Sequence, residues 1–352
     1  MIPTANLFEP LSPGWRETAA AALSAARLAP TEPLRPLKGG VSGALVCRVD
    51  THDGRFLLRL EPARIALAHR ERNAACMRAA ADAGVAPRVH HSDPVAGVTV
   101  MDFIEARPLA EHPGGSAAVV QGLGALIARI QTCPPFPTLG DGRDTLQLLL
   151  ATLARSGLFA PGLLDPHAEA LARLRVVRPW DAAALVPSHN DPNPRNLISD
   201  GRRLWLVDWE LACQNDPLFD LAIVSIELAD TPALQSALLS TTFGGPPDAA
   251  RMAELGVVRL LARLFYGCIA LEAFSSALGG SSPQDRRAPQ APLTDLDALT
   301  PAQFGDAIAA GRLGADHPEA TAFAFGLMSL RTFLDGVAAP GFDTMAASAQ
   351  RR

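Results

Sequence analysis

Along the first hundred residues, apolar and polar positions repeat in a way that predicts a small sheet with a covering helix. Two short apolar runs flank the turn THDG, and its Asp53-Gly54 pair is a strong signal for a β-hairpin. A helical pattern follows and ends at Gly84. The order of these elements predicts an α+β lobe with an antiparallel sheet. The expected elements are a helix within 1–30, strands at 41–50 and 55–61, a helix at 64–83, and strands at 88–93 and 97–105.

Beyond Pro108 the pattern becomes mainly helical. One β-hairpin is expected at 196–208, with a second Asp-Gly pair at its turn. We expect a loop at 279–300, which is rich in Gly, Ser and Pro, and a frayed tail after Pro340. Helices are expected at 115–132, 144–156, 166–176, 217–229, 231–241, 248–277, 301–311 and 317–336.

Length and composition fit two lobes and a large core. The chain has 352 residues, 48% of them hydrophobic. The change in pattern near 104–108 predicts a small N-lobe at 1–105 and a larger helical C-lobe at 106–352. The net charge of −5 implies no basic surface, so we expect no nucleic-acid partner. An apolar stretch at 255–274 is interrupted by two arginines, which favours a buried helix over a membrane span.

The cysteines and the N-terminus bear on the compartment. Five cysteines are scattered along the chain and form no CxxC pair, which disfavours a disulfide framework or a zinc site. The first fifteen residues lack the basic start and apolar run of a signal peptide. We therefore expect a cytoplasmic protein with no membrane segment.

The stretch at 186–222 carries the pattern most informative about chemistry. Transfer of a phosphoryl group from ATP needs one carboxylate to orient the attacking hydroxyl and oxygen ligands to hold magnesium on the phosphates. Asp191 and Asn196 are five residues apart, the D-x-x-x-x-N spacing of a kinase catalytic loop. The expected hairpin then returns the chain to the same place at Asp208. Asn196 and Asp208 would supply two oxygen ligands to magnesium.

Each of these residues taken alone has an ordinary structural interpretation. An Asp after an apolar strand is usually a loop residue or a helix cap, and an Asn in a Pro-rich loop is usually a turn former. The loop spacing, the hairpin and the Asp at its far end together favour the catalytic interpretation, because a motif gains weight from its structural context.

These residues resemble the aminoglycoside phosphotransferase and choline kinase superfamily, and most of all its choline/ethanolamine kinase branch, which includes the bacterial choline kinases. The shared signature is an H-N-D loop ending in Asn, then D-W-E, N-D-P and D-L-A. The matching residues here are His189-Asn190-Asp191, Asn196, Asp208-Trp209-Glu210, Asn215-Asp216-Pro217 and Asp220-Leu221-Ala222.

The resemblance implies a protein-kinase-like two-lobed fold and an ATP- and magnesium-dependent phosphotransferase acting on a small hydroxylated molecule. It implies that Asp191 is the catalytic base and that Asn196 and Asp208 bind magnesium. It places Glu210 beside the metal site. His189 and Asp220 would be structural residues that brace the loop.

The resemblance extends into the first lobe. The segment LKGGVSGALVCRV at 37–49 resembles a glycine-containing phosphate loop, in which backbone N–H groups approach phosphate oxygens. Its candidate nucleotide contacts are Gly39, Gly40, Ser42 and Gly43. Protein kinases have a lysine on this strand, whereas the choline kinase branch resembles this chain in using an arginine, here Arg59. Arg59 is expected to pair with Glu71 and to face the phosphates. The plain alternative for this pair is a surface ion pair.

The adenine and acceptor sites are less sharply defined by the sequence. Met101, Phe103 and Ile104 resemble the hinge that meets adenine, or are plain core residues. Candidate acceptor contacts are Trp209, Glu210, Tyr266 and Glu272, which would hold a cationic amino alcohol such as choline or ethanolamine. The residues around Tyr266 equally fit the core of a buried helix. One alternative is a kinase for an aminoglycoside, a sugar or a homoserine-type acceptor. A second alternative is a catalytically silent nucleotide-binding protein.

Overall fold

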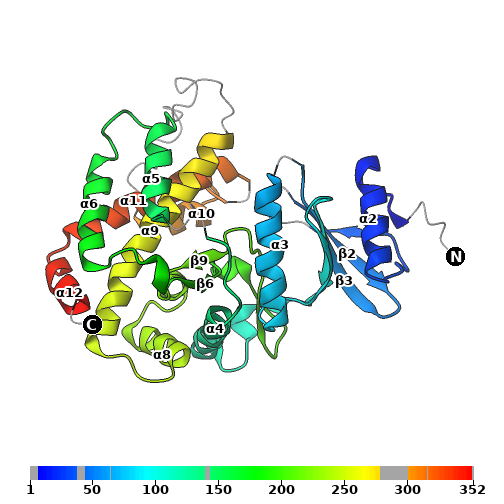
Figure 1. Ribbon diagram of the computed structural model, residues 1–352, viewed down its shortest axis with the longest axis horizontal. Coiled ribbons are helices and arrows are strands. Elements are labelled where there is room, and N and C mark those ends of the chain that lie inside the picture. Colours follow the sequence, from blue (N-terminus) through cyan, green and yellow to red (C-terminus); the bar gives the residue numbers. More distant parts are fainter. Residues whose placement is uncertain are drawn as a thin grey trace. The chain divides into compact units, whose positions relative to one another are not determined.

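The computed structural model describes residues 7–37, 44–63, 65–138, 143–277, 300–314 and 316–350 (Figure 1). By compactness the chain divides into two units. The first comprises Met1–Pro137 and Leu185–Pro246, and the second comprises Thr138–Ala184 and Pro247–Arg352. The first unit therefore contains the expected sheet, the hinge segment and the catalytic stretch. The lobe boundary near 104–108 stays a prediction.

The first unit is built on a five-stranded antiparallel sheet in the order β1-β2-β3-β5-β4. Thr51 pairs with Gly54 across a two-residue turn, so the hairpin predicted from the Asp-Gly pair is confirmed. Both later strands and their antiparallel pairing are confirmed as well. The strands are β1 (Arg35–Pro36), β2 (Leu45–Thr51), β3 (Gly54–Leu60), β4 (Val89–Asp93) and β5 (Val98–Asp102).

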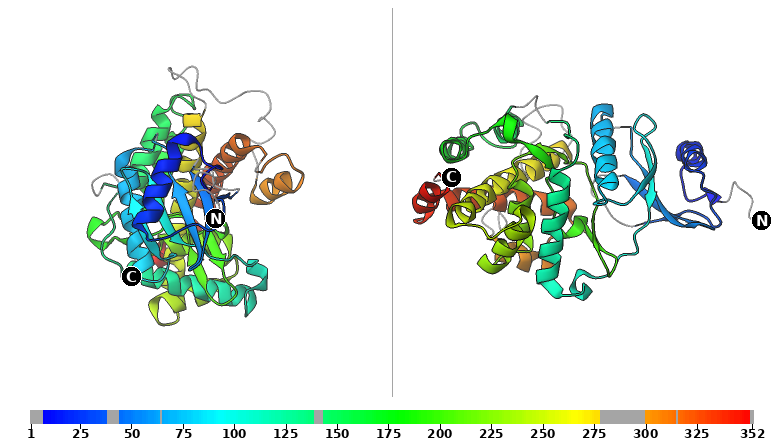
Figure 2. Two further views of the ribbon diagram at one scale, coloured as in Figure 1. Left: turned by 90° about the vertical axis from the view of Figure 1, so that its right-hand side faces the viewer. Right: turned by 60° about the horizontal axis from the view of Figure 1, so that its bottom comes forward.

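Two helices lie on opposite faces of this sheet (Figures 1 and 2). Helix α2 (Pro13–Ala25) packs its buried residues against Leu58 and Leu60 of β3 in one hydrophobic core. Helix α3 (Leu67–Asp82) lies on the other side. Successive strand residues point to opposite faces, so Arg59 points away from the core that Leu58 and Leu60 enter. This alternation places a cation on the face that carries the site.

In the described residues of the first unit, the chain outside this sheet is mainly helical, with two short strand pairs. The predicted hairpin is confirmed as β7 (Leu197–Ser199) and β8 (Leu204–Leu206), with Leu197 opposite Leu206. A second pair, β6 (Val186–Ser188) with β9 (Cys213–Asn215), was not expected from the sequence. These strands are three residues long, too short to show an alternating pattern. The helices are α4 (Gly115–Gln131), α7 (Phe219–Glu227) and α8 (Pro232–Phe243).

The second unit is helical in its described part. Helix α11 packs along α9, and Gly267 permits close contact because an added Cβ would meet the Leu330 side chain at 2.6 Å. The expectation of a frayed tail was wrong, since residues after Gly341 form α12 with Phe342 and Ala346 buried on one face. The helices are α5 (Thr145–Arg155), α6 (Asp165–Val177), α9 (Ala249–Ala277), α10 (Pro301–Ala309), α11 (Pro318–Ala338) and α12 (Phe342–Ala349).

Among the described helices, none alone has the length and apolarity of a membrane span. Helices α11 and α12 reach this length and apolarity only when taken together, as a pair bent by 82°.

Most of the loop expected at 279–300 lies outside the described residues.

Candidate active site

The loop that carries Asp191 is anchored to a buried carboxylate. It follows β6, and the backbone N–H groups of His189 and Asn190 donate to the two oxygens of Asp220, at 2.8 and 2.7 Å. Asp220 lies in the first turn of α7, and burial raises the pKa of its carboxyl group. Asn190 adopts a left-handed backbone with φ of 63°, which asparagine tolerates better than most residues. This geometry is what a bracing role for Asp220 requires.

The imidazole of His189 links the loop to the hairpin. Its Nε2 lies 3.0 Å from the carbonyl oxygen of Val207 and donates to it, while Nδ1 accepts from the backbone N–H of Asp191 at 3.3 Å. Because a carbonyl can only accept, these two bonds define a neutral ring protonated on Nε2. The ring packs against Trp209, with centroids 4.5 Å apart. His189 thus has the contacts of a structural residue.

Asn190 ties the loop to the segment that follows Asp208. Its Nδ2 donates to the carbonyl oxygen of Leu211 at 2.9 Å, and its Oδ1 accepts from Nδ2 of Asn215 at 2.8 Å. In the sequence, Asn190 and Asn215 belong to two separate motifs, and no contact between them was predicted. The structure gives these residues a shared task, because a buried amide pair holds two loops in register.

The carboxylate of Asp191 is held by two asparagines. Asn196 donates through Nδ2 to Asp191 Oδ2 at 2.7 Å and to the Asp191 carbonyl at 3.0 Å. Asn193 donates through Nδ2 to Asp191 Oδ1 at 2.7 Å. Sequence reasoning brought Asp191 and Asn196 together correctly but missed Asn193. The signal for it was its position between two prolines, which is typical of a cap.

The hairpin returns Asp208 to the base of this loop. The backbone N–H of Val207 donates to the carbonyl of Asn196 at 2.9 Å, so Asp208 follows directly after a residue paired with Asn196. Asp208 has φ of 64°, a left-handed conformation that aspartate adopts more readily than most side chains. The amide oxygen of Asn196 and the carboxylate of Asp208 are both hard donors and fit Mg²⁺.

Among the residues that the structure describes, no group of three or more His, Cys, Asp and Glu could hold a metal ion. A site with two protein oxygen ligands suits Mg²⁺ bound together with a nucleotide, because Mg²⁺ commonly takes its other ligands from phosphates and water. The described residues therefore fit a nucleotide-linked magnesium better than a metal caged by protein alone.

Arg59 faces a group of acidic side chains, which differs from the expected arrangement. Its guanidinium lies 3.3 Å from Asp208 Oδ1, 3.2 Å from Glu61 Oε1 and 4.0 Å from Glu210 Oε2. The expected pair with Glu71 is not formed among the described residues, where Glu71 is exposed on α3. The cause is local: Glu61 follows directly after β3, and its carboxylate lies 3.2 Å from Nε of Arg59.

Glu210 and Trp209 follow Asp208 but lie in different surroundings. Burial together with the charges of Asp208, Asp191 and Glu61 raises the pKa of Glu210 to about 7, although Arg59 opposes the shift. The Glu210 side chain keeps 41% exposure. Trp209 is only 3% exposed, and its Nε1 donates to the carbonyl of Leu206 at 3.2 Å. The expectation that Trp209 contacts an acceptor is therefore corrected, because its ring is part of the core.

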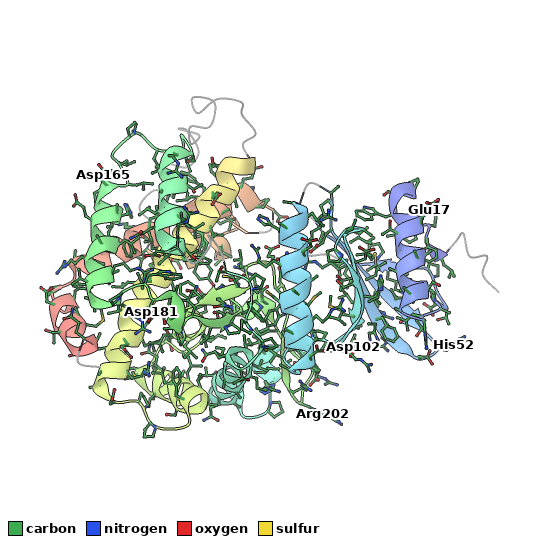
Figure 3. All side chains as sticks on the ribbon, in the orientation of Figure 1. Glu17, His52, Asp102, Asp165, Asp181 and Arg202 are labelled. Carbon is green, nitrogen blue, oxygen red and sulfur yellow. The ribbon has the colours of Figure 1, made fainter. Side chains whose placement is uncertain are left out.

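The hinge candidates lie at the end of β5. Met101 is buried in the sheet between Leu57 and Val89. The backbone N–H of Phe103 donates to the Arg55 carbonyl at 3.2 Å, and that of Arg107 donates to the Ser199 carbonyl at 2.7 Å. Adenine contacts in this segment stay a prediction. Asp102, which ends β5, is labelled in Figure 3.

The remaining phosphate-loop candidates cannot be placed in this site. Gly39, Gly40, Ser42 and Gly43 lie outside the described residues. Their assignment as nucleotide contacts stays a prediction from the sequence.

Tyr266 and Glu272 belong to α9 in the second unit, whereas Asp191 belongs to the first unit. Tyr266 is 8% exposed, and its ring packs on Phe325 with centroids 5.6 Å apart. Burial raises the pKa of Glu272. The surroundings of Tyr266 match the core alternative that the sequence had left open.

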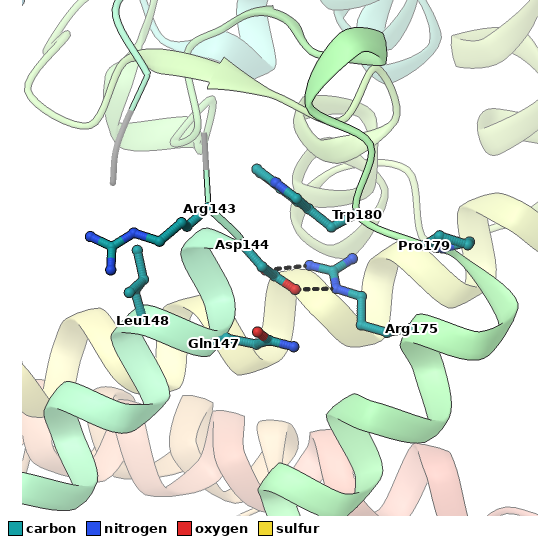
Figure 4. A pocket seen from close by; sticks show the side chains of 7 residues that line it. All are labelled: Arg143, Asp144, Gln147, Leu148, Arg175, Pro179 and Trp180. Carbon is teal, nitrogen blue, oxygen red and sulfur yellow. Dashed lines mark hydrogen bonds and ion pairs between the residues drawn. The ribbon is translucent and has the colours of Figure 1, made fainter. Parts of the chain in front are cut away.

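The second unit has a pocket of its own at the start of α5 and the end of α6 (Figure 4). Arg175 makes two hydrogen bonds to Asp144, at 2.6 and 2.8 Å, and stacks over the Trp180 ring at 5.5 Å. Asp144 also caps α5 by accepting from the backbone N–H of Leu146 at 3.0 Å. These contacts give the carboxylate a structural task.

Comparison with known proteins gives partial sequence matches and broad structural ones. Over 57 residues the chain is 40% identical to Protein LicA of Haemophilus influenzae, which is 16% of this chain and 21% of that protein. The chain therefore matches about a fifth of the length of this curated relative. A choline/ethanolamine kinase family protein from Mesorhizobium loti superposes with a TM-score of 0.65 at 22% identity, over 95% of this chain and 99% of that one.

Two further solved structures share the fold. Choline kinase LicA from Streptococcus pneumoniae has a TM-score of 0.57 at 15% identity, covering 77% of this chain and 95% of that one. Macrolide 2'-phosphotransferase MphH from Brachybacterium faecium has a TM-score of 0.53 at 20% identity, covering 76% and 95%. These likenesses confirm the expected kinase-like α+β fold. Residues 33–255 match the family model described as the phosphotransferase enzyme family, and the chain belongs to that family.

Proposed function

We propose that this protein is an ATP-dependent kinase that transfers the γ-phosphoryl group to a hydroxyl group of a small molecule. The observation that carries the proposal is the convergence of Asp191, Asn196 and Asp208 at the base of one hairpin, with Arg59 beside them. One oriented carboxylate, two oxygen donors for magnesium and one cation are the parts that phosphoryl transfer requires.

In the proposed reaction Asp191 orients the acceptor hydroxyl and takes its proton. The acceptor O–H bond breaks, an O–P bond forms to the γ-phosphorus, and the bond from that phosphorus to the bridging oxygen breaks to release ADP. The two asparagine bonds to Asp191 hold its carboxylate in one plane during this step. Arg59 would pair with phosphate oxygens, for which guanidinium geometry is well suited. Magnesium, held by Asn196 and Asp208, would neutralise phosphate charge.

We further propose that the acceptor is an amino alcohol such as choline or ethanolamine. Support comes from the D-W-E, N-D-P and D-L-A signature and from structural neighbours described as choline or ethanolamine kinases. Glu210, two residues after Asp208, offers a partly exposed carboxylate to a cation near the reacting hydroxyl. Aminoglycosides, sugars or homoserine are the alternative acceptors. The fold itself does not select among acceptors, since macrolide and spectinomycin phosphotransferases share it.

A substrate screen tests both levels of the proposal. Release of ADP from ATP would be measured with magnesium and, in turn, choline, ethanolamine, homoserine, neutral sugars and aminoglycosides. We expect the highest kcat/KM with an amino alcohol. Efficient turnover of an uncharged sugar with no response to amino alcohols would overturn the acceptor assignment and leave the kinase proposal standing. No turnover with any acceptor, but binding of ATP, would favour the catalytically silent alternative.

We also propose a cytoplasmic location. None of the five cysteines, all of which the structure describes, forms a disulfide. Burial raises the pKa of Cys47 to about 11 and of Cys268 to about 12, which keeps these thiols protonated and unreactive. Free, buried cysteines of this kind support the proposal that the protein works in a reducing compartment.

A further inference from the structure

Asn193 occupies a restrained position in the catalytic loop, between Pro192 and Pro194. A residue before proline is confined to extended backbone, and Asn193 has φ of −79° and ψ of 166°. It precedes the 3-10 turn Pro194–Asn196, and its side chain is buried, with the residue 5% exposed. The backbone therefore determines where this amide points.

Two hydrogen bonds fix the orientation of the Asn193 amide. Its Oδ1 accepts from the backbone N–H of Arg195 at 2.8 Å and so caps the turn. An oxygen used in this way leaves Nδ2 on the opposite side, where it donates to Asp191 Oδ1 at 2.7 Å. The same side chain thus serves as a cap and as a donor to the base.

The donor bond completes the restraint on the base. Asn196 Nδ2 holds Asp191 Oδ2 at 2.7 Å, so one amide donates to each oxygen of the Asp191 carboxylate. Rotation of that carboxylate about its Cβ–Cγ bond would break both hydrogen bonds. A base held in one plane meets the hydroxyl at a fixed angle, and loss of such alignment is costly to a reaction rate.

We propose that Asn193 is a positioning residue for the base, acting through Asp191 on the transfer step. This inference rests on the proposed kinase function. The bond to Arg195 alone would make Asn193 a turn cap, which is a purely structural task. The bond to Asp191 makes it part of the reaction.

The two tasks can be separated by an isosteric substitution. Asn193→Asp keeps an oxygen to cap Arg195, because Asp and Asn cap equally well, but it replaces the donor that faces Asp191. We expect kcat to fall ~10–100-fold, with KM for ATP unchanged. The new carboxylate lies buried against Asp191, so we also expect a lower melting temperature. Unchanged kcat in Asn193→Asp would overturn the inference and leave the capping role.

A second variant tests whether lost alignment or added charge causes the effect. Asn193→Ser also keeps a capping oxygen but has neither the donor amide nor a charge. We expect it to lower kcat as well. A normal kcat in Asn193→Ser would mean that only the new carboxylate harms the reaction, and it would overturn the positioning role.

A double-mutant cycle tests action through Asp191. In an Asp191→Asn background, Asn193→Asp should lower the residual turnover little further, because the base it positions is gone. Full multiplication of the two losses would overturn the inference. Wild-type protein without turnover on any acceptor would instead overturn the proposed function, and this inference with it.

Discussion

The guanidinium of Arg59 lies 3.3 Å from Oδ1 of Asp208, across 149 residues of chain. Arg59 lies on β3, in the middle of the sheet, and Asp208 lies two residues after the end of β8. The ion pair brings the candidate phosphate clamp against the candidate magnesium ligand. Both residues therefore face one place, where a nucleotide phosphate would meet a cation from each side.

The base is tested by Asp191→Asn, which keeps the size of the side chain and removes its charge. We expect kcat to fall by ~10²–10⁴, the usual contribution of a positioned general base, while ATP binding is retained. Asp53→Asn is the matched control, because Asp53 lies exposed in the β2–β3 turn and Asn suits the same turn. Near-normal turnover in Asp191→Asn would remove Asp191 from the mechanism.

The magnesium ligand is best tested by Asp208→Asn. Alanine would be strained at the left-handed φ of 64°, whereas asparagine tolerates it. We expect the extra thermal stabilisation that magnesium adds to ATP binding to become smaller, because a neutral amide oxygen attracts Mg²⁺ less than a carboxylate does. Melting curves with ATP, with and without Mg²⁺, measure this. If magnesium strengthens ATP binding equally in variant and wild type, the ligand assignment is wrong.

The phosphate clamp is tested by Arg59→Ala, which should raise KM for ATP because a charge-assisted contact to phosphate is lost. Arg55→Ala is the matched control: it lies on the same strand and face, but it is exposed and pairs with Glu105. Lys38 is the only lysine in the sequence and lies outside the described residues. Lys38→Ala should have a small effect. A larger effect from Lys38 than from Arg59 would place the clamp in the segment before β2.

Features encoded within a few residues could be predicted from the sequence. Asp191, Asn196 and Asp208 were placed together because the D-x-x-x-x-N spacing and the hairpin between them are local. The partner of Arg59 was not predicted correctly, because Asp208 is remote in sequence and the kinase template suggested Glu71. The two prolines beside Asn193 indicate a cap, but its hydrogen bond to Asp191 depends on the orientation of one amide, which no residue pattern records.

The helices of the second unit give a further contrast. Helix α9 was predicted in full from its long apolar periodicity. Helix α12 was missed because it has eight residues and only two large apolar side chains, Phe342 and Met345, to mark its packed face. Its stability comes from packing against α9, and packing between distant segments leaves little trace in a local pattern.

The last prediction concerns stability and pH through His167 of α6. Burial lowers the pKa of His167, and a backbone contact with Leu330 opposes the shift only in part. Its ring stacks on Phe333 of α11, with centroids 6.2 Å apart. The folded protein therefore keeps His167 neutral at a pH where the unfolded chain, with an ordinary pKa of about 6.5, already binds a proton.

Because the unfolded state binds more protons below that value, stability should rise with pH through this range. The contribution of His167 is complete above about pH 6.5 and is lost as the pH falls toward the lowered folded-state value. His167→Phe retains a ring against Phe333 but cannot titrate. Melting temperatures between pH 7.5 and 5 should fall more steeply for wild type than for this variant. Parallel curves would mean that His167 does not contribute to the acid sensitivity of the second unit.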